Sequence, residues 1–297
     1  MRVELTPTKV RRIVQENTEI CVQDVYLLGA GFDFETYLVN DEWVFRFPNT
    51  PSEADALVNE NHVLNGLSIP TTTPVYEHWL SRPTGYPMPV AGYRVIRGEC
   101  MEALDPDSCD TIQLAKDLAK TLQSLHGACV NHKRHTVNLD DFSSKEVVGS
   151  FDPVTVGLTT KEQSTAIQFV EQYRNNNKKI RSTRIHGDLG VEHIITKASR
   201  YLVGVIDWSN ATIGNRFKDF IGLWGWGGDH FVQEVLSHYQ DRPQHIDWAF
   251  IRVHGLMYCV HRLKLAVLHN HNYSSILCNR LRKRIKETRG MSPSDLP

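Results

Sequence analysis

The hydrophobic pattern of this chain changes once, near Arg97-Gly98-Glu99, and that change limits its possible folds more than any other feature. Before it, two runs rich in β-branched and aromatic residues, 36–39 and 43–47, flank a short polar turn, which predicts a β-hairpin. After it, apolar residues recur at helical spacing. We therefore expect an α+β chain of 297 residues, as one two-lobed unit or as two domains, with a β-rich N-lobe over 1–97 and a mainly helical C-lobe over 98–297.

One helix of the second part is marked at both ends. Asp110 is a good N-cap with Gln113 three positions later, and Gly127 follows the last of four leucines that repeat along one stripe. That stripe is expected in the core. Other helices are expected over 53–67, 161–175, 229–240 and about 246–270, a polar loop over 128–150, and a basic, solvated terminal helix face over 280–289.

Composition excludes several classes of protein. Lys plus Arg number 33 and Asp plus Glu 34, and a net charge of −1 argues against a protein that binds bulk nucleic acid or an anionic membrane. No stretch approaches the roughly 20 apolar residues that span a bilayer, and the N-terminus lacks a run of signal-peptide length. The six cysteines are scattered, without a CxxC pair or zinc-finger spacing. We expect free thiols and a cytoplasmic protein.

The stretch 184–208 carries the chemistry. A short loop holds Asp188, with His193 five residues later, and two strand-like runs, 193–196 and 201–206, then lead to Asp207. A hairpin of these strands is expected to bring Asp207 back beside Asp188 and His193. One carboxylate can accept or orient a hydroxyl proton, while the other, with a neutral donor, can hold a divalent cation against phosphates. This set of groups predicts metal-assisted phosphoryl transfer.

The same stretch resembles a known family. His186-Gly187-Asp188-Leu189 with His193-Ile194, followed by Val205-Ile206-Asp207-Trp208, is similar to the aminoglycoside phosphotransferases. The nearest members are the 2″-aminoglycoside phosphotransferases and the related macrolide kinases, which carry His where other kinases have Asn. The resemblance spans about residues 20–270. It implies a protein-kinase-like, two-lobed fold.

The resemblance implies roles for individual residues. Asp188 corresponds to the catalytic aspartate, and His193 and Asp207 to the Mg²⁺ ligands. Asp219 is expected to be structural and to hydrogen-bond the catalytic loop. The expected nucleotide-binding residues are the glycines of a phosphate-covering turn, Gly29 and Gly31; a phosphate-binding cation, Arg46, and its ion-pair partner, Glu60; and the hinge residues Tyr93, Val95 and Ile96.

The chain departs from the family pattern in three places. Asn215-Arg216 follows Gly214 where family members often have Asp-Pro, which indicates a turn variation near the substrate side. Arg46 stands where many kinases have Lys, and a guanidinium can reach phosphate in a bidentate manner, so function survives with different geometry. Glu192 follows the loop and either adds negative charge near the cleft or faces solvent. The candidate acceptor-binding residues are Glu192, Trp224, Trp226, Asp229 and Glu234, although tryptophans of this kind are more often part of the core.

The expected function is an ATP- or GTP-dependent transfer of phosphate to a small-molecule hydroxyl, with Mg²⁺ as cofactor. An aminoglycoside acceptor, and hence antibiotic resistance, is favoured over a macrolide. Two further hypotheses are a metabolic small-molecule kinase and a non-catalytic kinase-like binding module. Intact Asp188, His193 and Asp207 argue against the non-catalytic module. The expected state is a monomer or weak dimer.

Overall fold

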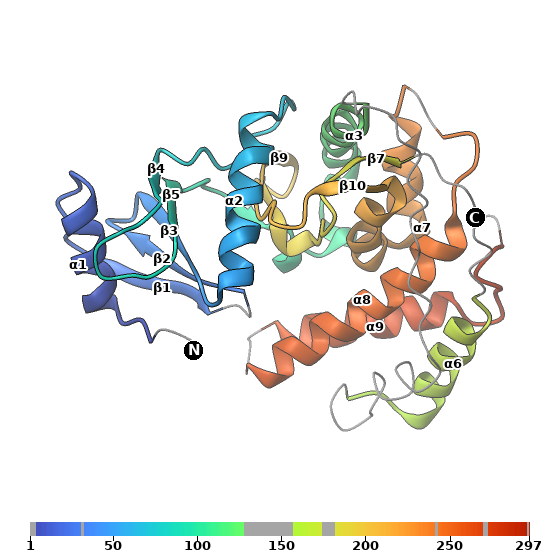
Figure 1. The fold of residues 1–297 in the computed structure, drawn as a ribbon. Coiled ribbons are helices and arrows are strands. Elements are labelled where there is room, and N and C mark those ends of the chain that lie inside the picture. Colours follow the sequence, from blue (N-terminus) through green and yellow to red (C-terminus); the bar gives the residue numbers. More distant parts are fainter. Residues whose placement is uncertain are drawn as a thin grey trace. The chain divides into compact units, whose positions relative to one another are not determined.

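The computed structural model describes residues 4–30, 33–127, 157–173, 182–240, 243–269, 273–295 and 297 (Figure 1). The chain divides into two compact units. The first unit comprises Met1–Gly98 and Val203–Ala211, and the second comprises Glu99–Leu202 and Thr212–Pro297. The nine residues that carry Asp207 therefore cluster with the N-terminal part of the chain, while their sequence neighbours on both sides belong to the second unit.

The first unit is built on an antiparallel sheet of five strands in the order β1-β2-β3-β5-β4. The predicted hairpin is confirmed. Its strands pair from Val39 opposite Trp43 to Phe34 opposite Pro48, across a turn in which Asn40 and Asp41 adopt positive φ angles of 55° and 54°. The strands are β1 (Val25–Ala30), β2 (Phe34–Val39), β3 (Trp43–Pro48), β4 (His78–Leu80) and β5 (Val90–Arg94).

Among the described residues of the first unit, two segments are helical, α1 (Pro7–Asn17) and α2 (Pro51–Asn65). Each begins with a proline, whose missing N–H costs nothing at a helix start. Helix α2 confirms the helix expected over 53–67, whereas α1 was not expected. One face of β3 packs Trp43, Phe45 and Phe47 into a core with Val10, Ile13 and Val14 of α1, and the opposite face holds Arg46.

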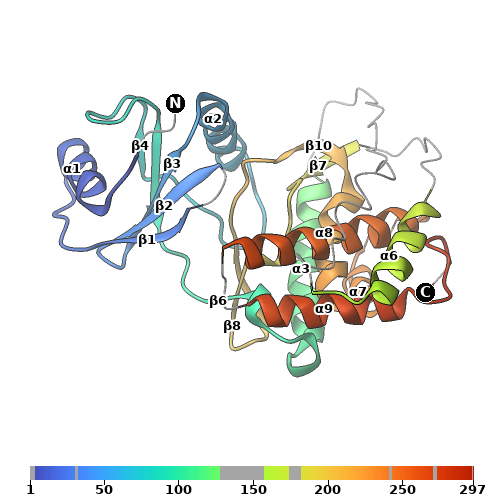
Figure 2. The ribbon, with the colours of Figure 1, turned by 90° about the horizontal axis from the view of Figure 1, so that it is seen from below.

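The second unit is mainly helical. Helices α8 and α9 run side by side in both views (Figures 1 and 2). The predicted leucine stripe of α3 is buried, and the Asp110 carboxylate accepts a hydrogen bond of 3.3 Å from the backbone N–H of Gln113, which confirms the N-cap. The helices are α3 (Thr111–Gly127), α6 (Thr160–Glu171), α7 (Ile221–Ser237), α8 (Trp248–Leu268) and α9 (Ser274–Glu287).

Short strands and single 3₁₀ turns connect these helices. Strand β7 (Ser182–Ile185) pairs with β10 (Thr212–Asn215), and β6 (Glu99–Cys100) pairs with β8 (Ile194–Lys197). Strand β9 (Tyr201–Val205) begins in the second unit and ends in the first. The 3₁₀ turns are η1 (Met101–Ala103), η2 (Pro106–Ser108), η3 (Val191–His193) and η4 (Arg216–Phe220).

Two expectations about the helical part need correction. The helix expected over 229–240 begins earlier, at Ile221, and bends at Gly228, where φ is 69°. The basic run 280–289 is not a purely solvated face, because Arg280 and Arg284 are 8% and 1% exposed. The guanidinium of Arg280 donates to backbone carbonyls at Glu102 and Leu104, so packing of α9 against that loop buries it.

The loop expected over 128–150 lies outside the described residues. Within the described part of the chain, no helix is long and apolar enough to cross a membrane.

Candidate active site

Three charged side chains of the first unit form a closed ring. Arg46 on β3 donates from Nη1 to Glu60 Oε2 at 2.5 Å and from Nη2 to Asp207 Oδ1 at 2.9 Å. Glu60 on α2 in turn accepts the backbone N–H of Trp208 at Oε1, at 2.9 Å. Asp207 has a φ of 62°, a strained conformation for a residue with a side chain. The ring ties both this residue and the one after it to the sheet and to α2.

The ring is held in a buried environment. Arg46 is 5% exposed and Glu60 is fully buried, which makes each charge costly unless it is paired. Burial lowers the pKa of Arg46, but the carboxylates of Glu60 and Asp207 outweigh it and raise that pKa above its ordinary value. Burial also raises the pKa of Glu60, opposed mainly by Arg46. Glu60 is therefore the buried counter-charge of Arg46, and the less buried Asp207 adds a second one.

The structure explains why an arginine suits position 46. Its two terminal nitrogens bind two different carboxylates, its Nη1 also reaches the Tyr76 hydroxyl at 3.3 Å, and its guanidinium lies 4.2 Å from the centre of the Phe34 ring. A lysine ammonium is a single point charge and cannot make this planar, forked set of contacts.

The other predicted nucleotide-binding residues lie on or beside the same sheet. Gly29 is in β1, and Gly31 lies outside the described residues. Tyr93 is buried in β5, and the backbone N–H of Val95 donates to the carbonyl of Glu42 at 2.8 Å. Ile96 is half-buried, and its side chain packs so closely on Gly204 that a Cβ at position 204 would overlap it. Their contact with a nucleotide stays a prediction.

A buried aspartate fixes the loop of the second unit. Asp219 accepts the backbone N–H groups of His186 and Gly187, both at 2.9 Å, and its Oδ2 lies 3.0 Å from Nε2 of His126. The φ of Gly187 is 83°, which favours glycine. The Tyr239 hydroxyl lies 3.2 Å from Nδ1 of the same His126 and completes the support. Asp219 therefore hydrogen-bonds the loop, as the resemblance implied.

Asp188 and His193 are joined through the backbone of this loop. The Asp188 side chain is exposed, and its carbonyl oxygen lies 2.8 Å from Nδ1 of His193. A carbonyl can only accept, so Nδ1 carries the proton and Nε2 carries the lone pair that a metal ion would use. His186 is fully buried and its Nδ1 accepts the Asp188 N–H at 3.4 Å, which fits a scaffold role.

Asp188 and His193 belong to the second unit and Asp207 to the first, so their convergence at one site stays a prediction. Among the described residues, no three His, Cys, Asp or Glu side chains gather into a ready metal cluster. Mg²⁺ keeps water and phosphate oxygens as ligands, and one or two protein groups suffice for it.

We predict a specific pH dependence from Asp219. Burial raises the pKa of its carboxyl, but His126, His186 and the Gly187 N–H outweigh burial and hold that pKa below its ordinary value. A group of this kind stabilises the fold fully above its unfolded-state pKa of about 3.9, and the contribution disappears as pH falls through the lower folded-state pKa. Asp219→Asn should lower stability by about 1–3 kcal/mol at pH 7.

Thermal unfolding between pH 7 and pH 2.5 checks this prediction. The difference in melting temperature between wild type and Asp219→Asn should begin to narrow below about pH 4, where the unfolded chain takes up a proton at this carboxylate, and should vanish only at the lower pH at which the folded carboxylate is also protonated. Asp55→Asn, on the exposed side of α2, is the control and should follow wild type throughout. A difference in melting temperature that stays constant down to pH 2.5 would show that the charge of Asp219 does not contribute to stability.

The three acidic residues predicted to bind the acceptor all have protein partners. Glu192 is paired with Arg262, with 3.2 Å between Oε1 and Nη1, and it accepts the Tyr258 hydroxyl. Burial raises the pKa of Glu192, but His193 and Arg262 outweigh it and lower that pKa, so the carboxylate stays ionised. Glu234 lies 2.9 Å from His238 one helical turn away.

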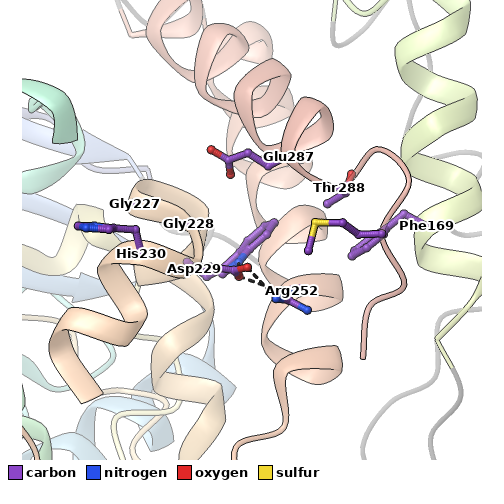
Figure 3. A pocket seen from close by; sticks show the side chains of 10 residues that line it. Phe169, Gly227, Gly228, Asp229, His230, Arg252, Glu287 and Thr288 are labelled. Atoms are coloured by element: carbon purple, nitrogen blue, oxygen red, sulfur yellow. Dashed lines mark hydrogen bonds and ion pairs between the residues drawn. The ribbon is translucent and has the colours of Figure 1, made fainter. Parts of the chain in front are cut away.

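Asp229 is the third of these acids, and it lines a cavity of about 330 Å³ (Figure 3). Its carboxylate accepts two hydrogen bonds from Arg252, at 2.9 and 2.7 Å, and one from the Trp224 indole at 2.7 Å. Glu287 and Thr288 at the end of α9, and Phe169 of α6, contribute other walls. Trp224 also lines this cavity.

Trp226 does not line it. That residue is fully buried and its indole N–H donates to the Leu104 carbonyl at 3.0 Å, so it belongs to the core.

Sequence reasoning missed the partners of these acids. Arg252, Tyr258 and Arg262 lie on α8, outside the stretch 184–208 that carries the recognisable motif. Their helical spacing was visible, but nothing in the sequence indicated which loop that helix packs against. Only the packing of α8 in the second unit brings them to Asp229 and Glu192.

Comparison with known proteins places these features in a family. The chain is 24% identical over 251 residues to the uncharacterized protein YcbJ of Bacillus subtilis strain 168, covering 78% of this chain and 79% of that protein. It is similar in structure to the complex of APH(2″)-IIIa with GDP and kanamycin, with a TM-score of 0.64, 22% identity and coverage of 95% and 98% of the two chains.

A second solved structure is less similar. Macrolide 2′-phosphotransferase type I matches with a TM-score of 0.52 and 16% identity, over 88% of this chain and 91% of that one. These likenesses show a protein-kinase-like fold, with a β-rich first part and a mainly helical second part. The family model described as the phosphotransferase enzyme family matches residues 24–254. This protein therefore belongs to the phosphotransferase enzyme family.

Proposed function

We propose that this protein transfers the γ-phosphoryl group of ATP or GTP to a hydroxyl group of a small molecule. The main support for this proposal is the loop at Asp188. Asp219 fixes the backbone of this loop, while the Asp188 side chain is exposed. A carboxylate held in this way can accept the hydroxyl proton or orient the hydroxyl as its oxygen attacks the γ-phosphorus. The bond from that phosphorus to the bridging oxygen breaks, and the nucleoside diphosphate leaves.

The charged ring of the first unit suits the nucleotide side of this reaction. Arg46, fixed by Glu60, is the cation proposed to bind phosphate, and the GDP bound to the similar APH(2″)-IIIa structure supports a nucleotide substrate. Asp207 supplies a hard carboxylate oxygen and His193 an imidazole nitrogen, and these two residues would hold Mg²⁺. When bound, Mg²⁺ neutralises the phosphate charge.

We favour an aminoglycoside as the acceptor, which would make the protein an antibiotic-resistance enzyme. The kanamycin bound in the similar structure and the cavity lined by Asp229 and Trp224 support this acceptor. One observation favours a macrolide as second candidate. Glu192, Asp229 and Glu234 are each paired within the protein, whereas a polycation needs carboxylates that are available to it.

We also propose a compartment for the reaction, supported by the thiols. The described cysteines are free, which suits a reducing compartment, and we place the reaction in the cytoplasm.

Screening by salt should distinguish an aminoglycoside acceptor from a macrolide acceptor. The Debye length falls from about 10 Å at 0.1 M to about 3 Å at 1 M salt, so ion pairs in an open site weaken. Loss of one exposed pair worth about 1 kcal/mol raises KM about fivefold. We expect the KM for kanamycin to rise by at least this factor, and the KM for the nucleotide to rise less. A macrolide should show little change.

The measurement is a coupled assay of nucleoside diphosphate release, with ATP and GTP, on both drug classes from low to high salt. Turnover of macrolides but not aminoglycosides, with a KM insensitive to salt, would replace the first candidate by the second. A thermal-shift screen tests the remaining two hypotheses. Stabilisation by a sugar or choline alone favours a metabolic kinase, and nucleotide binding without turnover of any acceptor favours a non-catalytic module.

A further inference from the structure

Glu192 lies at the centre of a buried network on the loop that carries Asp188 and His193. Its carboxylate accepts the Tyr258 hydroxyl at 2.5 Å through Oε2 and pairs with Arg262 at 3.2 Å through Oε1. The Glu192 side chain is only 16% exposed. Both carboxylate oxygens thus point to α8.

Tyr258 contacts the loop at two points. Its hydroxyl donates to Glu192 and accepts the backbone N–H of Val191 at 3.2 Å. Burial raises the pKa of this phenol well above its ordinary value, so it keeps the proton that it donates. One side-chain oxygen therefore fixes a side chain and a main-chain group of η3, between Asp188 and His193.

Arg262 connects Glu192 to a second acid. It lies one helical turn after Tyr258 on α8, and its Nε and Nη2 donate to both carboxylate oxygens of Glu102 at 2.9 and 2.8 Å. This bidentate pair is strong and directional, and the Glu102 side chain is only 6% exposed. The pair with Glu102 therefore holds the Arg262 guanidinium in the position from which it contacts Glu192.

Two glycines show how closely the loop is packed. A Cβ on Gly190 would overlap the Glu192 carboxylate, which folds back over that residue. A Cβ on Gly222 at the start of α7 would overlap the Leu189 carbonyl oxygen. The loop thus lies against α7 on one side and is held by α8 through Glu192. Small displacements of either contact would move Asp188 and His193.

We propose that Tyr258 and Arg262 are positioning residues that act through Glu192 to hold the loop from Asp188 to His193 in its working geometry. Glu192 is thereby assigned to this network rather than to the acceptor. The proposal rests on the proposed phosphotransfer function, because the geometry it protects is that of the proton acceptor and of the imidazole ligand. Partners of this kind behind metal ligands change metal affinity or activity by about 10–100-fold.

Tyr258→Phe and Glu192→Gln test the proposal in the full-length protein. Tyr258→Phe removes only the hydroxyl, and we expect kcat to fall about 10–100-fold and the Mg²⁺ concentration for half-maximal nucleotide binding to rise about tenfold. Acceptor KM should change less than about twofold, because the network does not contact the acceptor. Glu192→Gln keeps an acceptor for the hydroxyl but loses the ion pair, so its effect should be smaller in the same direction.

Hydrogen exchange gives a readout that does not depend on activity. The Val191 amide donates to the Tyr258 hydroxyl, so the peptide covering 188–194 should exchange faster in Tyr258→Phe. Tyr201→Phe is the matched control, because that ring is 45% exposed, and it should leave kcat, the Mg²⁺ midpoint and exchange unchanged. If wild type phosphorylates no acceptor, the proposed function fails, and exchange alone decides the positioning role.

Two results would overturn the proposal. An increase in acceptor KM for Glu192→Gln with unchanged kcat and unchanged exchange would place Glu192 in the acceptor site. A lower melting temperature for Tyr258→Phe with kcat, Mg²⁺ midpoint and loop exchange all as in wild type would make the network a general stabiliser. If Tyr258→Phe does not fold, the same comparison is made with Glu192→Gln.

Discussion

Asp188→Asn will lower kcat by about 10²–10⁴-fold while the protein stays folded and still binds nucleotide. The amide keeps the size of the side chain but cannot take up the hydroxyl proton or carry the negative charge that orients it. The Asp188 side chain is exposed and holds no buried charge, and the hydrogen bonds of its backbone N–H and carbonyl do not involve it. The loop should therefore keep its shape.

Steady-state kinetics, nucleotide titration and thermal unfolding of the same preparation separate these effects. Asp55→Asn is the matched control, an exposed aspartate on α2, and it should keep wild-type kcat. A value of kcat within about threefold of wild type in Asp188→Asn would remove this carboxylate from the mechanism. Loss of nucleotide binding together with kcat would indicate a folding defect instead.

Asp207→Ala will abolish the dependence of nucleotide binding on Mg²⁺ and reduce turnover by about 10²–10³-fold, the effect of several kcal/mol. Its carboxylate is the anionic group proposed to hold the metal ion, and a neutral imidazole at His193 binds Mg²⁺ poorly by itself. Arg46 keeps its partner Glu60 in this variant, so the buried guanidinium is not left without a counter-charge. The first unit should still fold.

Calorimetric titration of ATP and GTP, with and without Mg²⁺, measures the effect. Ser209→Ala is the control. It removes the hydroxyl that donates to Asp207 Oδ1 at 2.9 Å but leaves the carboxylate, and it should keep most of the Mg²⁺ dependence. An Asp207→Ala protein that responds to Mg²⁺ as wild type does would show that another group holds the ion.

Local features of the fold could be predicted because their signals are local. The turn between β2 and β3, the N-cap at Asp110 and the leucine stripe of α3 depend on residues within a few positions of one another. The kink of α7 at Gly228 was missed, since a glycine in an apolar helical stretch indicates by itself neither a positive φ nor what occupies the space beside it. Here the Arg284 guanidinium occupies it.

The candidate site likewise has features that the sequence predicted and a feature that it did not. Asp188, His193 and Asp207 could be proposed from the sequence as candidate site residues, because their residue types and short spacings lie in one continuous stretch. It also paired Arg46 with Glu60 through the family pattern, and the structure confirms that contact. It did not indicate that Asp207 would join the same ring.

Packing of the helices determines whether Glu192 and Asp229 already have partners within the protein. Glu192 and Tyr258 are 66 positions apart and Asp229 and Arg252 are 23 apart, so no local pattern relates them. Burial makes an unpaired charge costly, and packing of α8 against α7 and the loop at 188–193 supplies the partners of Glu192 and Asp229. Residue types along one stretch therefore determined the proposed reaction. Packing of α8 determined that Glu192 and Asp229 are paired within the protein, which the sequence could not show, whereas Glu234 pairs locally with His238, four positions later.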